Sequence, residues 1–139
     1  MKKFCFIILV LSFIQLEAQS LVGKWKTIDD ETGKEKSIVN IYKKGDKYYG
    51  DIVELINPSK PNPKCDVCRG EMKGKSVLGM TIINDMELEE DEYSSGTILN
   101  PSNGKVYKCQ LKFEDNPNEL RVRGYIAFFY KTQYWKRVN

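Results

Sequence analysis

Hydrophobic and polar residues alternate with a period of two along much of this chain, which is typical of β-strands with one buried face. The clearest case is the stretch 105–113, in which polar residues separate Tyr107, Cys109, Leu111 and Phe113. No helical periodicity of comparable length occurs. The pattern therefore predicts an all-β protein.

Eight strands are predicted, separated by short segments that contain glycine, proline and asparagine. We expect them at residues 22–28, 37–43, 47–56, 75–83, 92–99, 105–113, 119–129 and 131–138. Short strands at regular spacing with tight turns indicate an eight-stranded up-and-down antiparallel barrel. A barrel of this size either fills with side chains or holds one small ligand.

The first and last strands must pair to close such a barrel. Trp25 lies between Lys24 and Lys26, so its indole is expected to point inward. The combination of Gly23-Lys24-Trp25 on the first strand with an arginine near the last resembles the lipocalin-type barrel, which implies that Arg137 covers that indole at the closed end.

Two connections are longer than the rest. Residues 57–74 form the longest loop, and residues 84–92 form an acidic connection with room for one helical turn. The acidic run could bind calcium, but it lacks the spaced oxygen ligands and the turn glycine of a calcium loop. We expect a solvated connection there.

Residues 1–18 have the pattern of a secretory signal peptide. Lys2 and Lys3 precede the apolar stretch from Phe4 to Leu16, and Ala18 supplies a small residue at the cleavage position. A membrane anchor is disfavoured because a span needs about 20 apolar residues. The sequence predicts one domain, 19–139, that is periplasmic or secreted and has no stable membrane anchor.

The chain contains no histidine, which narrows the possible functions. It excludes Ser-His-Asp and Cys-His catalysis and every imidazole-based metal site. Removal of the leader lowers the formal charge from +3 to +2, and the basic residues are spread out, so nucleic-acid binding has little support. We expect no enzymatic activity, no metal and no cofactor.

Cys65 and Cys68 lie in the longest loop, after a proline-rich approach. Two cysteines so close, in an oxidising compartment, favour a disulfide that pins the loop. A bound metal or a redox pair are the alternatives, although no second pair of ligands and no βαβ pattern accompany them. Cys109 lies on the apolar face of its strand and is expected to be a buried free thiol. Pairing of Cys109 with one of the loop cysteines is the alternative.

Aromatic residues are numerous, and inside a barrel they either fill the core or line a pocket. Pockets are mostly apolar with a few placed polar groups. We therefore place a candidate pocket inside the barrel where aromatic and hydrogen-bonding residues share strands. Its candidate residues are Trp25, Tyr49, Asp51, Arg123, Tyr125 and Trp135, the last near the rim.

For Arg123, two features of the sequence favour opposite faces of its strand. A buried Arg123 needs a carboxylate partner because an unpaired buried charge is costly, and Asp51 is the nominee. However, Val122 and Ile126 on the same strand also favour the interior, and the two faces cannot both point inward. An Arg123 on the outer wall would exclude this pocket.

With these residues in view, the chain resembles the uncharacterised bacterial family called domain of unknown function 2147. The resemblance covers nearly the whole mature chain and rests on residues 23–33, 49–52, Cys65 and Cys68, 96–107, 122–125 and 132–138. It implies a small secreted protein with a lipocalin-like, calycin-type barrel, and it brings no established activity or ligand. Asn100 stands where the family usually has Asp, and Tyr130-Lys131 where it often has Gly-Arg.

Together these observations predict a binding protein, assumed to be a monomer, for a small, partly apolar ligand, or for a partner at the barrel opening. One alternative is a structural or interaction barrel with a filled core. The other is a histidine-free enzyme that uses Tyr, Asp and Arg inside the barrel. A filled interior would exclude both the ligand-binding protein and the enzyme.

Overall fold

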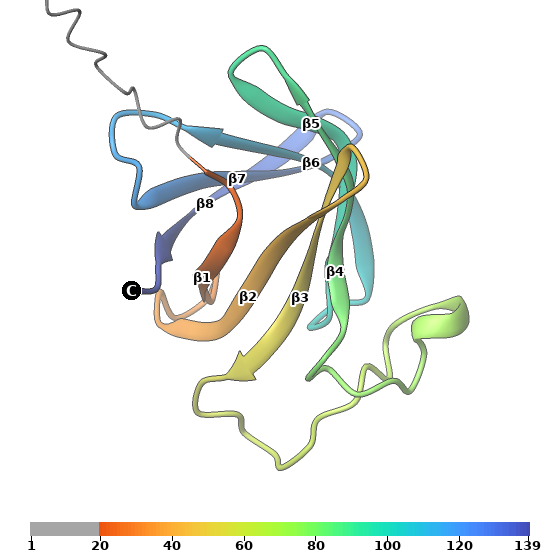
Figure 1. The fold of residues 1–139 in the computed structure, drawn as a ribbon. Helices are drawn as coiled ribbons and strands as arrows, with labels where there is room; N and C mark the ends of the chain where they lie inside the picture. Colours follow the sequence, from red (N-terminus) through yellow and green to blue (C-terminus); the bar gives the residue numbers. More distant parts are fainter. Residues whose placement is uncertain (1–19) are drawn as a thin grey trace, which may run out of the picture.

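The computed structural model describes residues 20–139, which form a closed barrel of eight antiparallel strands in sequence order (Figure 1). The expected fold class is confirmed. The predicted signal peptide, 1–18, lies outside the described residues. The strands are β1 (Gly23–Ile28), β2 (Glu35–Lys44), β3 (Lys47–Leu55), β4 (Thr81–Glu89), β5 (Glu92–Asn100), β6 (Lys105–Phe113), β7 (Glu119–Ile126) and β8 (Phe129–Arg137), with one 3₁₀ turn, η1 (Gly70–Met72).

An up-and-down barrel has two ends, and in this protein one end is closed and the other is open. At the closed end lie the start of β1, the end of β8 and the β2–β3, β4–β5 and β6–β7 connections. At the open end lie the β1–β2, β3–β4, β5–β6 and β7–β8 connections. The β3–β4 segment, residues 56–80, is much the longest of these and projects from the barrel in Figure 1.

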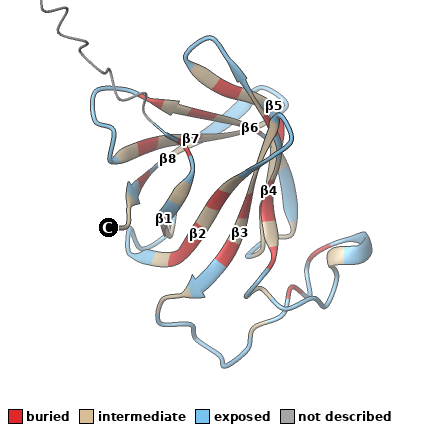
Figure 2. Ribbon diagram, viewed as in Figure 1, coloured by how far each residue is buried: buried red, intermediate tan, exposed pale blue. Residues whose placement is uncertain are grey.

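Buried and partly exposed residues alternate along the strands (Figure 2). The buried residues point to the interior of the barrel and form the core. On β6 the predicted alternation is confirmed, since Cys109, Leu111 and Phe113 are buried. Cys109 is a free thiol, as expected, and its burial raises its pKa to about 12.

Trp25 is fully buried and plugs the closed end. Its indole packs against the Phe113 ring, with 5.8 Å between ring centroids, and its Nε1 donates a hydrogen bond to the Leu21 carbonyl at 3.0 Å. The Arg137 guanidinium lies 4.2 Å from the indole centroid. The predicted cover over Trp25 is therefore confirmed.

β1 and β8 close the barrel, as predicted. Their register pairs are Trp25 with Arg137 and Lys26 with Lys136. The Val138 backbone N–H extends this seam by donating to the Lys24 carbonyl at 2.9 Å. With all eight strands paired in a ring, no edge strand is left open.

The prediction for β4 was wrong. The strand covers 81–89 rather than 75–83, so most of the expected acidic connection, 84–92, is strand. A β-bulge explains the error: Asp85 has φ +56°, and Ile83 and Met86 are both buried although they are three positions apart. An extra residue in a strand breaks the period of two on which strand recognition depends.

The turn between the last two strands also differs from the prediction. It lies at Ala127-Phe128, because Ile126 pairs with Phe129, whereas the sequence pattern continued the strand to 129. Phe128, which a strand continuing to 129 would place on the same face as Val122, is 99% exposed. Leu120 and Val122 are buried, so the interior face of β7 ends before the hairpin tip.

Candidate functional site

A cavity of about 140 Å³ lies inside the open end of the barrel. All eight strands contribute residues to its wall, and the β3–β4 and β5–β6 connections border it. The interior is therefore packed at one end and hollow at the other.

Most of the cavity wall is apolar. Its apolar side chains come from seven strands and the β3–β4 segment, and they are Ile28, Ile52, Leu55, Val77, Ile82, Ile98, Leu99, Tyr107, Val122 and Trp135. Gly124 adds a bare stretch of backbone, because a Cβ at this position would press against the Tyr107 side chain. Such a wall suits an apolar molecule, or the apolar part of a larger one.

Two buried hydroxyl groups stand in this wall. Thr27 on β1 and Ser37 on β2 are register partners, and their hydroxyl oxygens are 2.6 Å apart in a hydrogen bond. Both are almost fully buried, at 6% and 5% exposure. Each hydroxyl keeps a free lone pair, so the pair can accept a hydrogen bond from a molecule in the cavity.

A second polar group comes from β8. The Gln133 side chain accepts a hydrogen bond from Trp135 Nε1 at 2.8 Å, and its amide nitrogen donates to the Asp30 carboxylate. All three residues line the cavity. The chain of bonds fixes the Trp135 ring in the wall and joins β8 to the β1–β2 turn.

Two lysines stand at the cavity mouth, Lys36 and Lys131. The Lys36 ammonium contacts the Ser102 hydroxyl and lies 3.8 Å from Asp29. Asp29 accepts hydrogen bonds from the backbone of Thr32 and Glu31, which lower its carboxyl pKa and keep it charged. The mouth therefore carries cations held partly by neighbouring polar groups.

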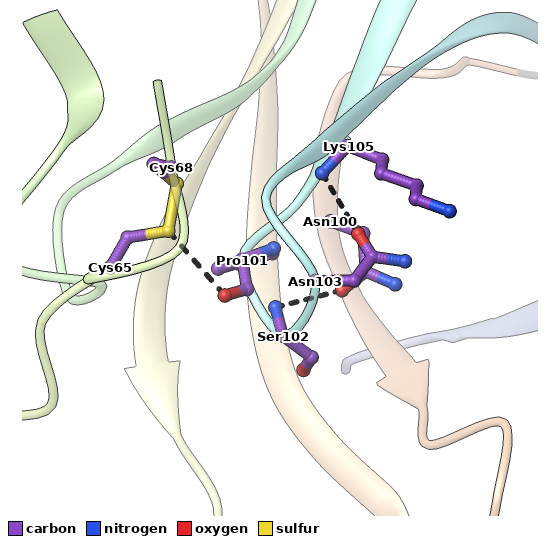
Figure 3. Close-up of a disulfide and its surroundings, with 7 residues drawn as sticks. All are labelled: Cys65, Cys68, Asn100, Pro101, Ser102, Asn103 and Lys105. Carbon is purple, nitrogen blue, oxygen red and sulfur yellow. Dashed lines mark hydrogen bonds between the residues drawn. A yellow bond between two sulfur atoms is a disulfide. The ribbon is translucent and has the colours of Figure 1, made fainter. Parts of the chain in front are cut away.

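The β3–β4 segment forms one side of the mouth and is tied to the β5–β6 turn. Cys65 and Cys68 form the predicted disulfide, with their Cα atoms 5.3 Å apart, so neither thiolate is available to a metal. Figure 3 shows this disulfide beside Pro101, whose carbonyl oxygen lies 3.4 Å from Cys65 Sγ. A disulfide sulfur has no proton to donate, so this is a packing contact. Pro101 in turn lines the cavity.

Of the predicted site residues, Trp135 lines the cavity and Trp25 does not. Trp25 belongs to the plug at the closed end, where its indole N–H is already bonded to Leu21. Its role in this structure is packing.

Tyr49 and Asp51 lie on the outer wall, contrary to the prediction, because Gly50 and Ile52 occupy the inward positions of β3. Asp51 accepts hydrogen bonds from Thr81 at 2.6 Å and from Tyr42 at 3.2 Å. Burial and the nearby Asp51 raise the Tyr42 pKa. The Tyr49 hydroxyl donates to Asp85, and this bond raises the pKa of Tyr49.

Arg123 and Tyr125 also face outward, so the predicted pairing of Arg123 with Asp51 is wrong. Val122 is buried and Gly124 borders the cavity, and strand alternation places their neighbours on the other face. Arg123 Nε donates to the Thr132 hydroxyl at 2.9 Å, and its guanidinium lies 5.0 Å from the Tyr130 ring centroid. The interior pocket predicted around these residues is not formed.

Sequence reasoning missed Thr27, Ser37 and Gln133. The signal was present, since Thr27 follows Trp25 by two positions and Gln133 precedes Trp135 by two. Residues two apart on a strand share a face, so an inward tryptophan implies an inward neighbour. Small polar residues on such a face mark a place where the core is not filled.

No cluster of three or more Cys, Asp or Glu side chains suited to a metal ion occurs within residues 20–139. The polar groups of the cavity are hydroxyls, amides, lysines and the Asp30 carboxylate around an apolar wall. This arrangement can orient a bound molecule through hydrogen bonds.

Comparison with known proteins gives two matches. The model of a bacterial family, described as uncharacterized protein conserved in bacteria (DUF2147), matches residues 23–137. Among solved structures, protein HP1028 from the human pathogen Helicobacter pylori, described as belonging to the lipocalin family, aligns with a TM-score of 0.74. The identity is 20% over 86% of this chain and 84% of that one, so the likeness concerns the fold alone. No curated protein matches this chain.

Proposed function

This chain belongs to the DUF2147 family of bacterial proteins and has a lipocalin-like barrel, and we propose that it is a binding protein for a small, partly apolar molecule. The molecule would enter the open end of the barrel and lie in the cavity there. No catalytic step is part of this proposal.

The hollow open end is the observation that supports it. A cavity of about 140 Å³ is close to the roughly 150 Å³ that suffices for a molecule of the size of benzene. Because the mouth is open, a longer molecule can extend from the cavity between the β1–β2 turn and the β3–β4 segment.

The wall also suggests which parts of the ligand go where. An apolar body would pack against Ile52, Ile98 and Val122, which surround the hollow. A hydrogen-bonding group would reach the Thr27 and Ser37 hydroxyls, which are the buried polar side chains of this barrel. A small, partly apolar compound with one polar group fits both requirements.

The place of action is part of the proposal. The apolar run 4–16 and the small residue Ala18 support export from the cytoplasm, and the Cys65–Cys68 disulfide suits an oxidising compartment. N-terminal sequencing of protein recovered from its host should find a chain that begins at Gln19. A chain that keeps residues 1–18 would contradict this.

The two alternative functions have less support. A filled structural barrel would have no hollow of this size at its open end. A barrel enzyme was expected to use Tyr, Asp and Arg inside the barrel, and the pocket candidates of these types, Tyr49, Asp51 and Arg123, lie on the outer wall. Neither alternative is favoured by a specific contact.

Native mass spectrometry of the protein purified from its own host tests the proposal. We expect a fraction of the protein to carry additional mass that leaves on gentle activation and is identified as one small compound. That compound, added back to stripped protein, should change the emission of Trp135, whose ring is part of the cavity wall. Protein that carries no added mass and binds nothing from a host extract would contradict the proposal.

A matched pair of variants locates the binding. Ile98→Trp places an indole in the cavity, and Val53→Trp places one on the outer wall, where the Val53 side chain is 43% exposed. We expect the first variant to lose the bound compound and the second to keep it. Equal retention by both would show that the compound binds elsewhere.

A further inference from the structure

We propose that the tip of the β7–β8 hairpin, residues 126–130, docks the open end of the barrel on an anionic lipid surface. We call these five residues, Ile-Ala-Phe-Phe-Tyr, the aromatic tip. This docking is independent of the nature of any ligand in the cavity.

The aromatic tip exposes an unusual amount of apolar surface. Phe128 is 99% exposed, Phe129 is 76% exposed and Tyr130 is 59% exposed. Figure 2 shows this hairpin end among the exposed parts of the barrel. Contiguous exposed apolar patches mark binding surfaces, because their exposure to water has a cost that a folded protein otherwise avoids.

The two residues of the turn are unfavourable for a tight β-hairpin. A two-residue hairpin loop favours glycine or asparagine where φ is positive, yet this loop consists of Ala127, with φ +51°, and Phe128. A side chain at positive φ strains the backbone. The tip thus combines backbone strain with a bare aromatic ring, which indicates that its residues serve contact with something outside the barrel.

The strands that carry the tip are strongly cationic. β6, β7 and β8 together contain eight Lys and Arg residues and one acidic residue, Glu119. Lys105 and Lys108 on β6, Arg123 on β7 and Lys131 on β8 lie toward the open end, beside the tip. Insertion of aromatic side chains together with a basic patch is the combination that holds proteins reversibly on anionic bilayers.

The densest acidic cluster lies at the other end of the barrel, although the β1–β2 turn at the open end also holds Asp29, Asp30 and Glu31. Residues 85–92, at the closed end of β4 and β5, contain six Asp and Glu residues and no Lys or Arg. A negatively charged surface would therefore attract the β6–β8 side and repel the acidic hairpin. The charge asymmetry orients the barrel with its open end toward the lipid.

The rim of the open end continues the apolar surface. Other exposed apolar side chains at this end are Val67, Leu78 and Val106, at 53%, 47% and 57% exposure. Lys131, two positions after Phe129, already lines the cavity mouth. Docking at the tip would therefore bring the cavity mouth against the bilayer surface. Among residues 20–139 no helix is long and apolar enough to cross a membrane.

The charges favour lipid over a second copy of this chain. Two tips meeting about a two-fold axis would bring the same cations face to face, and like charges across an interface are unfavourable. Anionic headgroups instead complement Lys105, Lys108 and Arg123, while the Phe rings enter the acyl boundary.

Vesicle binding tests the proposal with residues 20–139, which contain all eight strands and lack the apolar run 4–16 that would itself bind lipid. We expect binding to vesicles of equal parts phosphatidylglycerol and phosphatidylcholine, weakened by high salt. Vesicles of phosphatidylcholine alone should bind at least about tenfold more weakly. Equal binding to both kinds of vesicle, or to neither, would overturn the proposal.

Variants distinguish vesicle binding through the aromatic tip from nonspecific binding through other exposed apolar residues. The double change Phe128→Ser and Phe129→Ser should weaken binding at least about tenfold, since both rings leave water on docking. Leu88→Ser is the matched control, because Leu88 is 53% exposed on the acidic hairpin at the other end. It should bind as the unchanged protein does. A double variant that binds normally would exclude the tip as the docking element.

Charge-reversal variants and a spectroscopic signal complete the test. Lys105→Glu with Lys108→Glu should reduce binding, whereas Lys44→Glu, at the closed-end β2–β3 turn, should not. In Phe128→Trp, the added indole is exposed while Trp25 and Trp135 are buried, so its emission should shift to shorter wavelength on vesicle binding. An unshifted emission, or sedimentation of free protein as a dimer that the double Phe variant abolishes, would show that the tip meets another protein surface instead.

Discussion

Arg137 holds the closed end together through several contacts of one side chain. Its guanidinium covers the Trp25 indole and donates hydrogen bonds to the backbone carbonyls of Ser20 at 2.7 Å and Pro117 at 3.1 Å. These carbonyls belong to the segment before β1 and to the β6–β7 connection. A planar group with five donors can satisfy such a set while it stacks on a ring.

We therefore expect Arg137→Lys to destabilise the protein by about 1–2 kcal/mol, although the charge is kept. Trp25→Ala should cost about 3–5 kcal/mol because it leaves a cavity in the plug. Urea unfolding measures both values. Lys136→Arg is the control, since Lys136 is exposed, and it should change stability by less than about 0.5 kcal/mol. An Arg137→Lys protein as stable as the unchanged one would show that charge alone suffices.

Cys109 makes stability depend on pH at the alkaline end. Burial raises the pKa of its thiol from 9.0 to about 12, so the folded protein keeps the proton that the unfolded chain releases above about pH 9. The unfolded state then binds fewer protons than the folded state, and the free energy of unfolding falls as pH rises from about 9 toward 12.

The corresponding test compares the unchanged protein with Cys109→Ala by urea unfolding at about pH 8 and about pH 10. Between these values we expect the unchanged protein to lose about 1 kcal/mol more than the variant. Parallel losses in the two proteins would mean that the thiol ionises in the folded state as easily as in the unfolded one.

At the scale of elements, two close backbone approaches shape the barrel and its loop. Gly96 on β5 lies where a Cβ would overlap the Asn84 carbonyl and the Met86 sulfur, beside the bulges of β4 and β5. Gly104, in the β5–β6 turn, lies where a Cβ would overlap the Val67 carbonyl next to the disulfide. The second approach lets the β3–β4 segment pack on the rim of the cavity.

Gly104→Ala should detach that segment from the β5–β6 turn. Gly33→Ala is a matched control, because both glycines have a φ near +70° but Gly33 has no atom within 4 Å of the added Cβ. We expect a cost of about 1–2 kcal/mol for Gly33→Ala from the backbone conformation alone. Gly104→Ala should cost at least about 2 kcal/mol more, with faster amide exchange in residues 64–77. Equal costs for the two variants would mean that the segment moves aside freely.

For the whole molecule, closure of the ring depends on its shortest pairing. The β1–β8 register covers Trp25 with Arg137 and Lys26 with Lys136, whereas β2 and β3 pair along almost their full length. Trp25 and Arg137 thus take part both in the β1–β8 pairing and in the packing that fills the closed end. This arrangement makes the seam the place where local opening should begin.

Native-state hydrogen exchange should show this order. We expect amides of β1 and β8 at the seam to exchange through local opening, at lower free energy than those of the β4–β5 ladder. In Arg137→Lys the seam should exchange faster still, with the β4–β5 amides changed only by the loss of global stability. Uniform protection around the ring would contradict a weak seam.

The sequence by itself determined the fold class and most strand positions. The reason is that hydrophobic alternation is a local property, which can be recognised in each strand without knowledge of the others. It also determined the disulfide, where two cysteines three apart lie in a loop, and the inward Trp25 between two lysines. The pairing of the terminal strands followed from the need to close the ring, and the Arg137 cover was implied by the resemblance to lipocalin-type barrels.

Tertiary structure decided the position of β4, the inward face of β7 and the place of the cavity. The bulge at Asp85 shifts the register between strands, which depends on the neighbouring strand as much as on β4 itself. On β7, Val122 faces the interior and Arg123 bonds Thr132 on the outer wall, because a valine gains from burial whereas a buried guanidinium is costly unless it is paired. The hollow around Thr27 and Ser37 exists because side chains from many strands stop short of one another there, and that sum is visible only once the barrel is closed.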